Sequence, residues 1–303
     1  MYFKQEKNMK CNIIGAGRLG KNIALALSQT QLITSFAICN RSLESTQKVC
    51  QELGFGQPID KIEHLPAAEV TWICCNDDAI TDVVETLMRY DVLKPKSFVI
   101  HCSGVLNSDL LKPLKKQGCF VASFHPLKAF KTNYLDASAF QHVDCVLEGD
   151  AEVCDWLQQA FTQLGANLIA IEPAAKNAYH AAACMASNYL ITLAACSEEL
   201  FQHAGINPQQ SRKMMVNLMQ GNLNNLLQTE KIAESLTGPL ARGDVQTLAL
   251  HLQAIENPEI RRLYQSAALS TLPLARLSEE IKKQIRGLCS LDESEFFTGQ
   301  VND

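Results

Sequence analysis

The stretch "CNIIGAGRLGKNIALAL", which begins at Cys11, constrains the fold more than any other part of the chain. A short apolar segment leads into three glycines, Gly15, Gly17 and Gly20, and a helical pattern follows. The first glycine permits a tight turn, the second lets the backbone approach a pyrophosphate, and the third lets helix and strand pack closely. Unpaired N–H groups at the start of the helix attract phosphate. The motif predicts a dinucleotide-binding βαβ unit, with a glycine-rich turn that binds no ligand as the alternative.

Apolar runs alternate with amphipathic segments through the first 172 residues. Strands are predicted at 11–14, 35–39, 70–75, 98–102, 119–124, 144–147 and 168–171, and helices at 21–28, 43–53, 80–88 and 152–164. Continuous apolar strands separated by helices indicate a mostly parallel sheet that is covered on both faces. From Lys176 onward the pattern is helical, at 176–204, 208–227, 245–255 and 259–288. The sequence predicts a doubly wound α/β domain over 1–172 and an all-helical domain for substrate binding and dimerisation over 173–303.

Composition narrows the classes of partner. The chain has 303 residues, with 27 lysines and arginines against 32 aspartates and glutamates, and its net charge is −5. Neither half is basic, so the electrostatic footprint of a nucleic-acid-binding protein is missing. We therefore expect a small-molecule substrate and no nucleic acid.

Cysteine usage and hydropathy indicate the compartment. The 12 cysteines stand singly apart from Cys74–Cys75, without a C-x-x-C pair or zinc-site spacing, which favours free thiols, no metal and a cytoplasmic location. The first ten residues lack the apolar run of a signal peptide. Residues 177–197 carry no charge, yet polar side chains such as Asn177 and Asn188 argue against a membrane span. We expect a helix buried in a core or a subunit interface, and no membrane contact.

The residues "NRS" after the second predicted strand indicate which dinucleotide is bound. Arg41 follows Gly20 by 21 residues, about where an acid binds the ribose 2′-hydroxyl of NAD. Asn40 carries no charge, whereas Arg41 can bind a 2′-phosphate and Ser42 can add a hydroxyl. The alternative is a solvated arginine at a strand end. The pattern predicts NADP(H) as the cofactor.

Two further strand ends complete the predicted cofactor site, because ligands of an open parallel sheet bind beyond the carboxyl ends of its strands. Asn76 and its neighbours follow one strand, and Ser103 follows another. Capping of the next helix by Asp77 or Asp78 is the alternative for the first group. The predicted cofactor-binding residues are Gly15, Ala16, Gly17, Arg18, Leu19, Gly20, Asn40, Arg41, Ser42, Cys75, Asn76, Asp77, Ser103 and Gly104.

Three residues are candidates for catalysis, since hydride transfer to a carbonyl or imine needs a proton partner. His180 is a candidate because a free histidine side chain has a pKa near neutrality, and Lys176 lies one turn earlier on the same helix face. His125 precedes Pro126 at the end of a strand and is a rival proton donor. The alternatives are a solvated lysine for Lys176, a hydrogen-bonded core ring for His180 and a ring bonded to a backbone carbonyl for His125. His101 lies within a strand and is expected to be internal.

The stretch "LTGPLARGD" supplies a candidate for substrate binding. Arg242 can bind a substrate carboxylate because a guanidinium matches its geometry. Its neighbour Asp244 is predicted to cap the helix over 245–255 by accepting from the N–H of Gln246 or Thr247.

Four motifs in this order resemble one bacterial family: "HCSGVLNSDLL", "ASFHPLKAF", "KNAYHAAACMASNYL" and "LTGPLARGD". The family combines a Rossmann-like NADP-binding domain with a helical C-terminal domain of unknown function, and the resemblance runs from about Lys10 to Leu252. It implies a Rossmann sheet, bound NADP and a homodimer formed through the helices, but no substrate. The chain more distantly resembles pyrroline-5-carboxylate reductase and the β-hydroxyacid and 6-phosphogluconate dehydrogenases. Lys176 matches the catalytic lysine of the β-hydroxyacid dehydrogenases, whereas His180 stands where they have an asparagine.

Two functions remain open from the sequence. The first is an NADP-dependent oxidoreductase that acts on a small keto, hydroxy or imino substrate at the cleft between the domains. The second is a non-catalytic NADP(H)-binding protein with a redox-sensing or regulatory role. A structural or nucleic-acid-binding protein has little support in the sequence.

Overall fold

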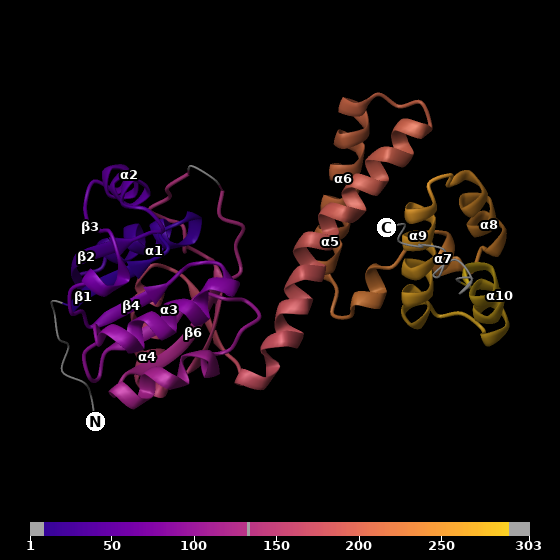
Figure 1. The fold of residues 1–303 in the computed structure, drawn as a ribbon. Coiled ribbons are helices and arrows are strands. Elements are labelled where there is room, and N and C mark those ends of the chain that lie inside the picture. Colours follow the sequence, from indigo (N-terminus) through magenta and orange to yellow (C-terminus); the bar gives the residue numbers. More distant parts are fainter. Residues whose placement is uncertain (1–8, 132–133, 291–303) are drawn as a thin grey trace, which may run out of the picture. The chain divides into compact units, whose positions relative to one another are not determined.

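The computed structural model describes residues 9–131 and 134–290, and the chain divides into two compact units, 1–186 and 187–303 (Figure 1). The first unit contains an eight-stranded sheet in the order β3-β2-β1-β4-β5-β6-β7-β8. Among the strand pairs of these described residues, β6 with β7 is antiparallel and the others are parallel. The predicted mostly parallel sheet is therefore confirmed. Its strands are β1 (Met9–Ile14), β2 (Ile33–Cys39), β3 (Gln57–Ile59), β4 (Val70–Ile73), β5 (Phe98–His101), β6 (Phe120–Pro126), β7 (Asp144–Gly149) and β8 (Asn167–Ala170).

Helices cover both faces of the sheet. Apolar side chains of α1 and α4 pack on one face against Trp72 and Phe124. The second face packs against α3 and η2, through residues such as Leu87 and Leu111. The helical elements of this part are α1 (Arg18–Ser28), α2 (Leu43–Leu53), η1 (Ile62–His64), α3 (Asp77–Tyr90), η2 (Ser108–Gln117), α4 (Ala151–Gln163) and η3 (Pro173–Ala175). Burial of this much apolar surface on two faces is what stabilises an open parallel sheet.

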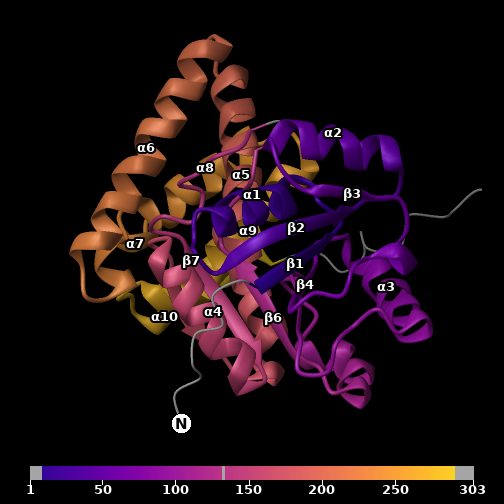
Figure 2. The same ribbon diagram turned by 90° about the vertical axis from the view of Figure 1, so that its left-hand side faces the viewer.

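The order of the strands creates a switch point beside β1. Figure 2 shows β1 between β2 and β4, and the chain proceeds outward from β1 in both directions. The helices that follow β1 and β4 pack on opposite faces, and doubly wound sheets bind their ligands at the carboxyl edge of such a switch point. The glycine motif lies in the loop between β1 and α1.

Two elements differ from the sequence prediction for identifiable reasons. Strand β3 was not predicted; it has only three residues, includes Pro58 and lies at the sheet edge, where a missing backbone donor is tolerated. The helix predicted over 259–288 is broken into α9 (Pro258–Thr271), the turn η5 (Leu272–Leu274) and α10 (Glu279–Cys289). Pro273 lacks the N–H that a continuous helix needs, and Ser278 caps α10 by accepting from the N–H of Ile281.

The second unit is helical, as predicted. The division into units falls inside α5 (Lys176–His203), so the predicted domain boundary after residue 172 stays a prediction. The other elements are α6 (Pro208–Gln228), η4 (Ile232–Ser235), α7 (Pro239–Arg242) and α8 (Val245–Ala254). Helices α8, α9 and α10 enclose a small core that includes Leu248, Leu272 and Ile285.

Helix α5 is largely exposed. Met185, Tyr189 and Ile191 are 67%, 58% and 69% exposed, so the core of the unit to which each belongs does not bury them. The alternative, burial in a subunit interface, remains a proposal. None of the helices in the described parts of the chain combines the length and apolar character needed to cross a membrane.

Candidate functional site

Two of the three motif glycines are required by packing. A Cβ atom at Gly15, whose φ is +84°, would lie 2.6 Å from the backbone nitrogen of Cys75. At Gly20 it would lie 2.8 Å from the carbonyl oxygen of Gly15. A Cβ at Gly17 would meet nothing within 4 Å. Packing within the protein thus requires glycine at positions 15 and 20, whereas no described atom would contact a side chain at position 17 within 4 Å.

The start of α1 presents backbone donors without a side-chain cap. Gly17 occupies the N-cap position, no side chain caps the N–H groups of the first turn, and the first turn has no acidic residue. Arg18 is exposed, and its guanidinium has no hydrogen bond or ion pair in the described parts of the chain, while its carbonyl accepts from the side-chain amide of Asn22. Leu19 is half-buried. No side chain of the described residues therefore caps the positive end of the helix dipole, which is favourable for binding an anion.

Of the three residues after β2, Asn40 and Ser42 make hydrogen bonds within the protein, whereas Arg41 has an unpaired guanidinium among the described residues. Asn40 accepts a hydrogen bond of 2.7 Å from the N–H of Ala16, so it holds the glycine loop. Ser42 caps α2 by accepting from the N–H of Ser45. Arg41 is exposed and has no partner among the described residues. Of the predicted 2′-phosphate ligands, Arg41 is the one whose side chain is uncommitted.

The end of β4 does not cap the next helix with an aspartate. Asn76 is the N-cap residue of α3 and makes no side-chain cap bond, so the capping alternative for Asp77 and Asp78 is not observed. Asp77 Oδ2 instead accepts a hydrogen bond of 2.9 Å from the hydroxyl of Ser103. Asp77 and Ser103 thus join the ends of β4 and β5. Burial raises the pKa of the neighbouring Cys75 thiol to about 11, so that thiol is neutral.

Lys176 is buried against two strand ends. Its side chain is 1% exposed, and Nζ donates to the backbone carbonyl of Ser103 at 2.9 Å and to the hydroxyl of Ser123. The alternative of a solvated lysine is therefore wrong. Burial lowers the pKa of Lys176 to about 8, an effect that the carboxylate of Glu148 opposes. The ammonium still predominates at neutral pH.

His125 is bonded to a tyrosine of α5. Its Nδ1 lies 2.8 Å from the hydroxyl of Tyr179, and the two rings meet edge to face. The partner is a side chain, so the alternative of a ring bonded to a backbone carbonyl is not observed. Burial lowers the pKa of His125 to about 4, and the neighbouring Lys176 and His180 add to that effect. The imidazole of His125 is therefore neutral at pH 7.

His180 approaches His125 beside Gly104. The two imidazole centroids are 5.7 Å apart, with the rings at 82°. His180 Nε2 lies 3.7 Å from the sulfur of Cys184, whereas its Nδ1 is buried and has no partner in the described parts of the chain. A Cβ atom at Gly104 would lie 2.6 Å from His180 Nδ1 and 3.0 Å from His125 Nε2. Both rings therefore point a nitrogen at the same stretch of backbone.

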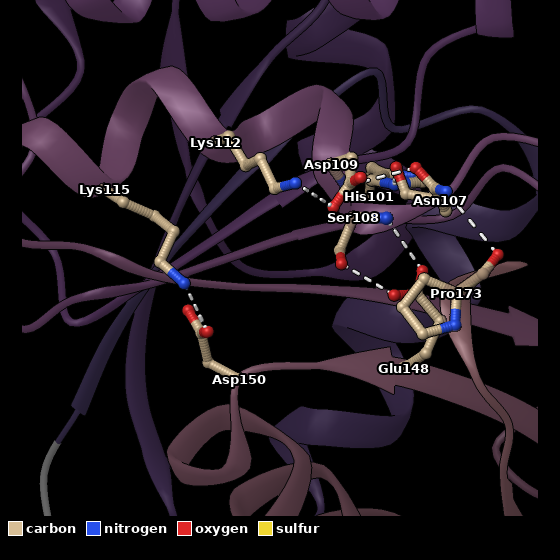
Figure 3. A network of polar contacts seen from close by, with 9 residues as sticks. All are labelled: His101, Asn107, Ser108, Asp109, Lys112, Lys115, Glu148, Asp150 and Pro173. Atoms are coloured by element: carbon tan, nitrogen blue, oxygen red, sulfur yellow. Dashed lines mark hydrogen bonds and ion pairs between the residues drawn. The ribbon is translucent and has the colours of Figure 1, made fainter.

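A polar network fixes the segment after β5 (Figure 3). Glu148 is 3% exposed and accepts from the N–H and the hydroxyl of Ser108, at 2.8 and 2.6 Å. Asn107 accepts through its carbonyl from Nε2 of His101 and donates to the carbonyl of Pro173. His101 is fully buried, as predicted, and burial lowers its pKa to about 4. The network ties β5, β7 and the chain just before Lys176 together.

Three of these groups were not predicted. Tyr179 lies three residues after Lys176 and one before His180, so helical spacing alone places it on the same face. Ser123 lies two residues before His125 on one strand face, which is a second available signal. Glu148 offers no such signal, because nothing near it in sequence indicates that Ser108 donates two hydrogen bonds to it.

Arg242 belongs to the second unit. It is exposed at the end of α7, and its predicted role in binding substrate stays a prediction. Asp244 caps α8, as predicted, by accepting from the N–H of Thr247 at 3.0 Å. Within residues 9–131 and 134–290, no three histidine, cysteine, aspartate or glutamate side chains are grouped to hold a metal ion.

The fold is that of a two-part chain, with a doubly wound sheet followed by helices. Residues 3–126 match the Rossmann-like domain, and residues 143–271 match the domain of unknown function DUF2520. The chain therefore combines a Rossmann-like domain with a DUF2520 domain. No curated protein matches it in sequence.

Solved structures share this fold. A provisionally assigned NADP oxidoreductase from Bacteroides fragilis is 18% identical, with a TM-score of 0.72, over 88% of this chain and 99% of the other. A Thermotoga maritima protein is 24% identical, with a TM-score of 0.66, over 91% and 99%. Pyrroline-5-carboxylate reductase from Streptococcus pyogenes is 17% identical, with a TM-score of 0.61, over 94% and 100%. At these identities the likeness establishes the fold.

Proposed function

We propose that the chain is an NADP(H)-dependent oxidoreductase that acts on a small keto, hydroxy or imino substrate. The observation that carries this proposal is the convergence of His125 and His180 on Gly104, three residues beyond the end of β5. Gly104 follows Ser103, which is bonded to Asp77 at the neighbouring strand end. The position is where a doubly wound sheet binds its ligands. The names of the Bacteroides and Streptococcus proteins point to the same class of reaction.

The residues after β1 and β2 fit the cofactor. The open space beside Gly17 and the uncapped start of α1 suit a pyrophosphate, which the N–H groups near Arg18 and Leu19 would bind. Arg41 would bind the 2′-phosphate. Cys75, Asn76, Asp77, Ser103 and Gly104 would border the nicotinamide and its ribose. A bound NADPH supplies a hydride, and the chain supplies orientation and protons.

The cluster around Gly104 would serve the substrate. His125 and His180 hold or exchange the proton, because each presents a ring nitrogen at the same place. Lys176 acts on the site through the Ser103 carbonyl and its charge, since its own side chain is buried. Arg242 remains the proposed partner of a substrate carboxylate. In this proposal the two histidines handle the proton, Lys176 supplies a nearby positive charge, and Arg242 binds the substrate.

A fluorescence titration with NADPH and NADH tests the cofactor assignment. We expect NADPH to bind more tightly, and Arg41→Ala to lose roughly 10–100-fold in NADPH affinity, because a charge-assisted contact is lost. NADH affinity should not change. Arg89→Ala, at an exposed position of α3, is the matched control. Equal affinity for the two nucleotides in wild type would refute the assignment, and binding of NADPH without any turnover would favour the regulatory alternative.

We also propose a homodimer formed through α5 and α6. Leu218 and Leu227 of α6 are 61% and 87% exposed, and Ile191 of α5 is 69% exposed. Apolar side chains in such numbers mark association surfaces. Light scattering should give a dimer for wild type and a monomer for Leu227→Glu, with Leu43→Glu on α2 as the control. A monomeric wild type would contradict this proposal.

A further inference from the structure

We propose that Cys74 and Cys102 form a redox-active dithiol, which a hydroperoxide converts to a disulfide within the chain. The two residues follow directly after the ends of β4 and β5. Neither cysteine has a role in the function proposed above, and this inference does not depend on that function. The site would make the chain a target of reversible oxidation.

The two sulfurs are already in contact. Both cysteines are free thiols, and Cys74 Sγ lies 3.7 Å from Cys102 Sγ. A disulfide has an S–S distance of about 2.05 Å, so the sulfurs have to approach each other by roughly 1.7 Å. Rotation about the two Cα–Cβ bonds is the movement that brings them together.

The register of the sheet keeps the two backbones at a suitable distance. Ile73 pairs with His101 in the parallel ladder, and Cys74 and Cys102 are the next residues of the two chains. The N–H of Cys102 donates to the carbonyl of Ile73, which holds the strand ends together at this point. Neighbouring strands lie about 4.8 Å apart, within the range of about 4.4–6.8 Å between Cα atoms that a disulfide spans. The backbone therefore need not move for the bond to form.

Both side chains lie on the same face of the sheet. Cys74 and Cys102 pack against the core beneath α1, whereas Cys75 packs against the core of the opposite face. Successive side chains of an extended segment alternate between the faces in this way. Cys75 is thus directed away from the pair, although it is adjacent to Cys74 in sequence.

The pair lies at an accessible edge of the sheet. Cys74 and Cys102 are half-buried, whereas Cys11, Cys145 and Cys289 are buried. Partial exposure distinguishes thiols that react from those that serve only in packing. A molecule as small as hydrogen peroxide can therefore approach the two strand ends.

The protonation of Cys74 indicates which sulfur reacts first. The hydrogen bond with Cys102 and burial together hold the pKa of Cys74 well above its ordinary value. A thiol attacks as its thiolate, so Cys74 is the slower nucleophile of the two. We assign the first attack to Cys102 and the second to Cys74.

The oxidation balances with a hydroperoxide as the only co-reactant. The Cys102 sulfur attacks a peroxide oxygen, the O–O bond breaks, and the Cys102 proton leaves with the other oxygen as an alcohol, or as water from hydrogen peroxide. Cys102 is then a sulfenic acid. The Cys74 sulfur attacks the Cys102 sulfur, the S–O bond breaks, and the hydroxide leaves as water with the Cys74 proton. Two thiols have lost two electrons, and the peroxide has gained them.

Mass spectrometry of the full chain tests the disulfide. The reduced protein is treated with hydrogen peroxide, the remaining thiols are alkylated, and the peptides are mapped. We expect a cross-link between Cys74 and Cys102 at about tenfold less peroxide than oxidises the other cysteines, and its reversal by dithiothreitol. Cys75→Ser should keep the cross-link, and Cys74→Ser should lose it. If Cys74 and Cys102 of the wild type stay reduced while other cysteines are oxidised, the proposal is wrong.

A trapping experiment tests the order of attack. In Cys74→Ser the second step is blocked, so we expect dimedone to label Cys102 as a sulfenic acid. The wild type should show little label there, because Cys74 consumes the sulfenic acid. Thermal unfolding checks that the variant is folded, and the map of the wild type needs no variant. A folded Cys74→Ser protein without label at Cys102 would overturn the assignment of the first attack.

Discussion

Asn40 accepts a hydrogen bond of 2.7 Å from the backbone N–H of Ala16, and so joins the end of β2 to the glycine loop. The same residue donates its own N–H to Thr46 in α2. One side chain and its backbone thus fix the geometry of two loops that would meet the cofactor. In the region where NAD-binding folds have an acid for the ribose 2′-hydroxyl, this chain has an asparagine whose amide holds the glycine loop.

Asn40→Ala removes this restraint. We expect the free energy of unfolding to fall by about 1 kcal/mol, because the Ala16 N–H loses its acceptor. NADPH affinity should fall roughly fivefold through disorder of the loop. Urea unfolding and fluorescence titration measure the two effects. Asn188→Ala, at an exposed position of α5, is the control, and unchanged affinity in Asn40→Ala would contradict a role in the site.

Gly17→Ala and Gly20→Ala separate binding from packing. The added methyl at position 17 meets open space, so we expect stability to change by about 1 kcal/mol or less and NADPH binding to be lost at least tenfold. At position 20 the methyl meets the Gly15 carbonyl, and stability should fall by about 1–3 kcal/mol. Thermal unfolding and titration of both variants check the contrast. Normal NADPH binding by a folded Gly17→Ala protein would show that the pyrophosphate lies elsewhere.

Lys176 should make stability rise in mild alkali. Its pKa is about 8 in the folded chain, below the 10.5 of a free lysine, so folding disfavours its protonated form. Stability from this group is therefore complete above pH 10.5 and is lost as pH falls to 8. Between pH 8 and 10 the wild type should gain about 2–3 kcal/mol relative to Lys176→Met. Urea unfolding at both pH values measures this, with Lys48→Met as the exposed control.

His125 should make stability fall in acid. Its pKa is lowered from 6.5 to about 4, so the folded chain favours the neutral ring. This contribution is present above pH 6.5 and is lost as pH falls toward 4. Because the ring is only half-buried, we expect the wild type to lose about 2 kcal/mol relative to His125→Asn between pH 7 and 4.5. His142→Asn, at an exposed position, is the control, and a flat wild-type profile would contradict the burial of His125.

Local patterns predicted most of the fold. Strands β1 and β2 are continuous apolar runs, and the glycine spacing between β1 and α1 is visible within ten residues. Strand β3 was missed because Gln57 and Pro58 carry no strand signal. The break before α10 lies at Pro273, and a proline within a helical pattern is a local signal for such a break. The sequence predicts an element correctly where the residues of that segment alone determine its conformation.

The candidate site depends on contacts that no local pattern specifies. Lys176 and the Ser103 carbonyl are 73 residues apart in sequence, and their contact depends on where α5 begins relative to β5. The sequence predicted Lys176, His180 and His125 as a group through helix spacing and strand position. Their burial, and with it the lowered pKa of Lys176 and of His125, follows from tertiary packing. Tyr179 was overlooked although its spacing placed it beside them.

The contacts of Gly104 limit how this site can evolve. Every other amino acid begins with a Cβ, and at this position that atom would overlap both imidazoles. A saturation library should therefore contain no active variant at position 104, including alanine. Related proteins with a different substrate specificity would have to keep this glycine and differ in the side chains that surround it.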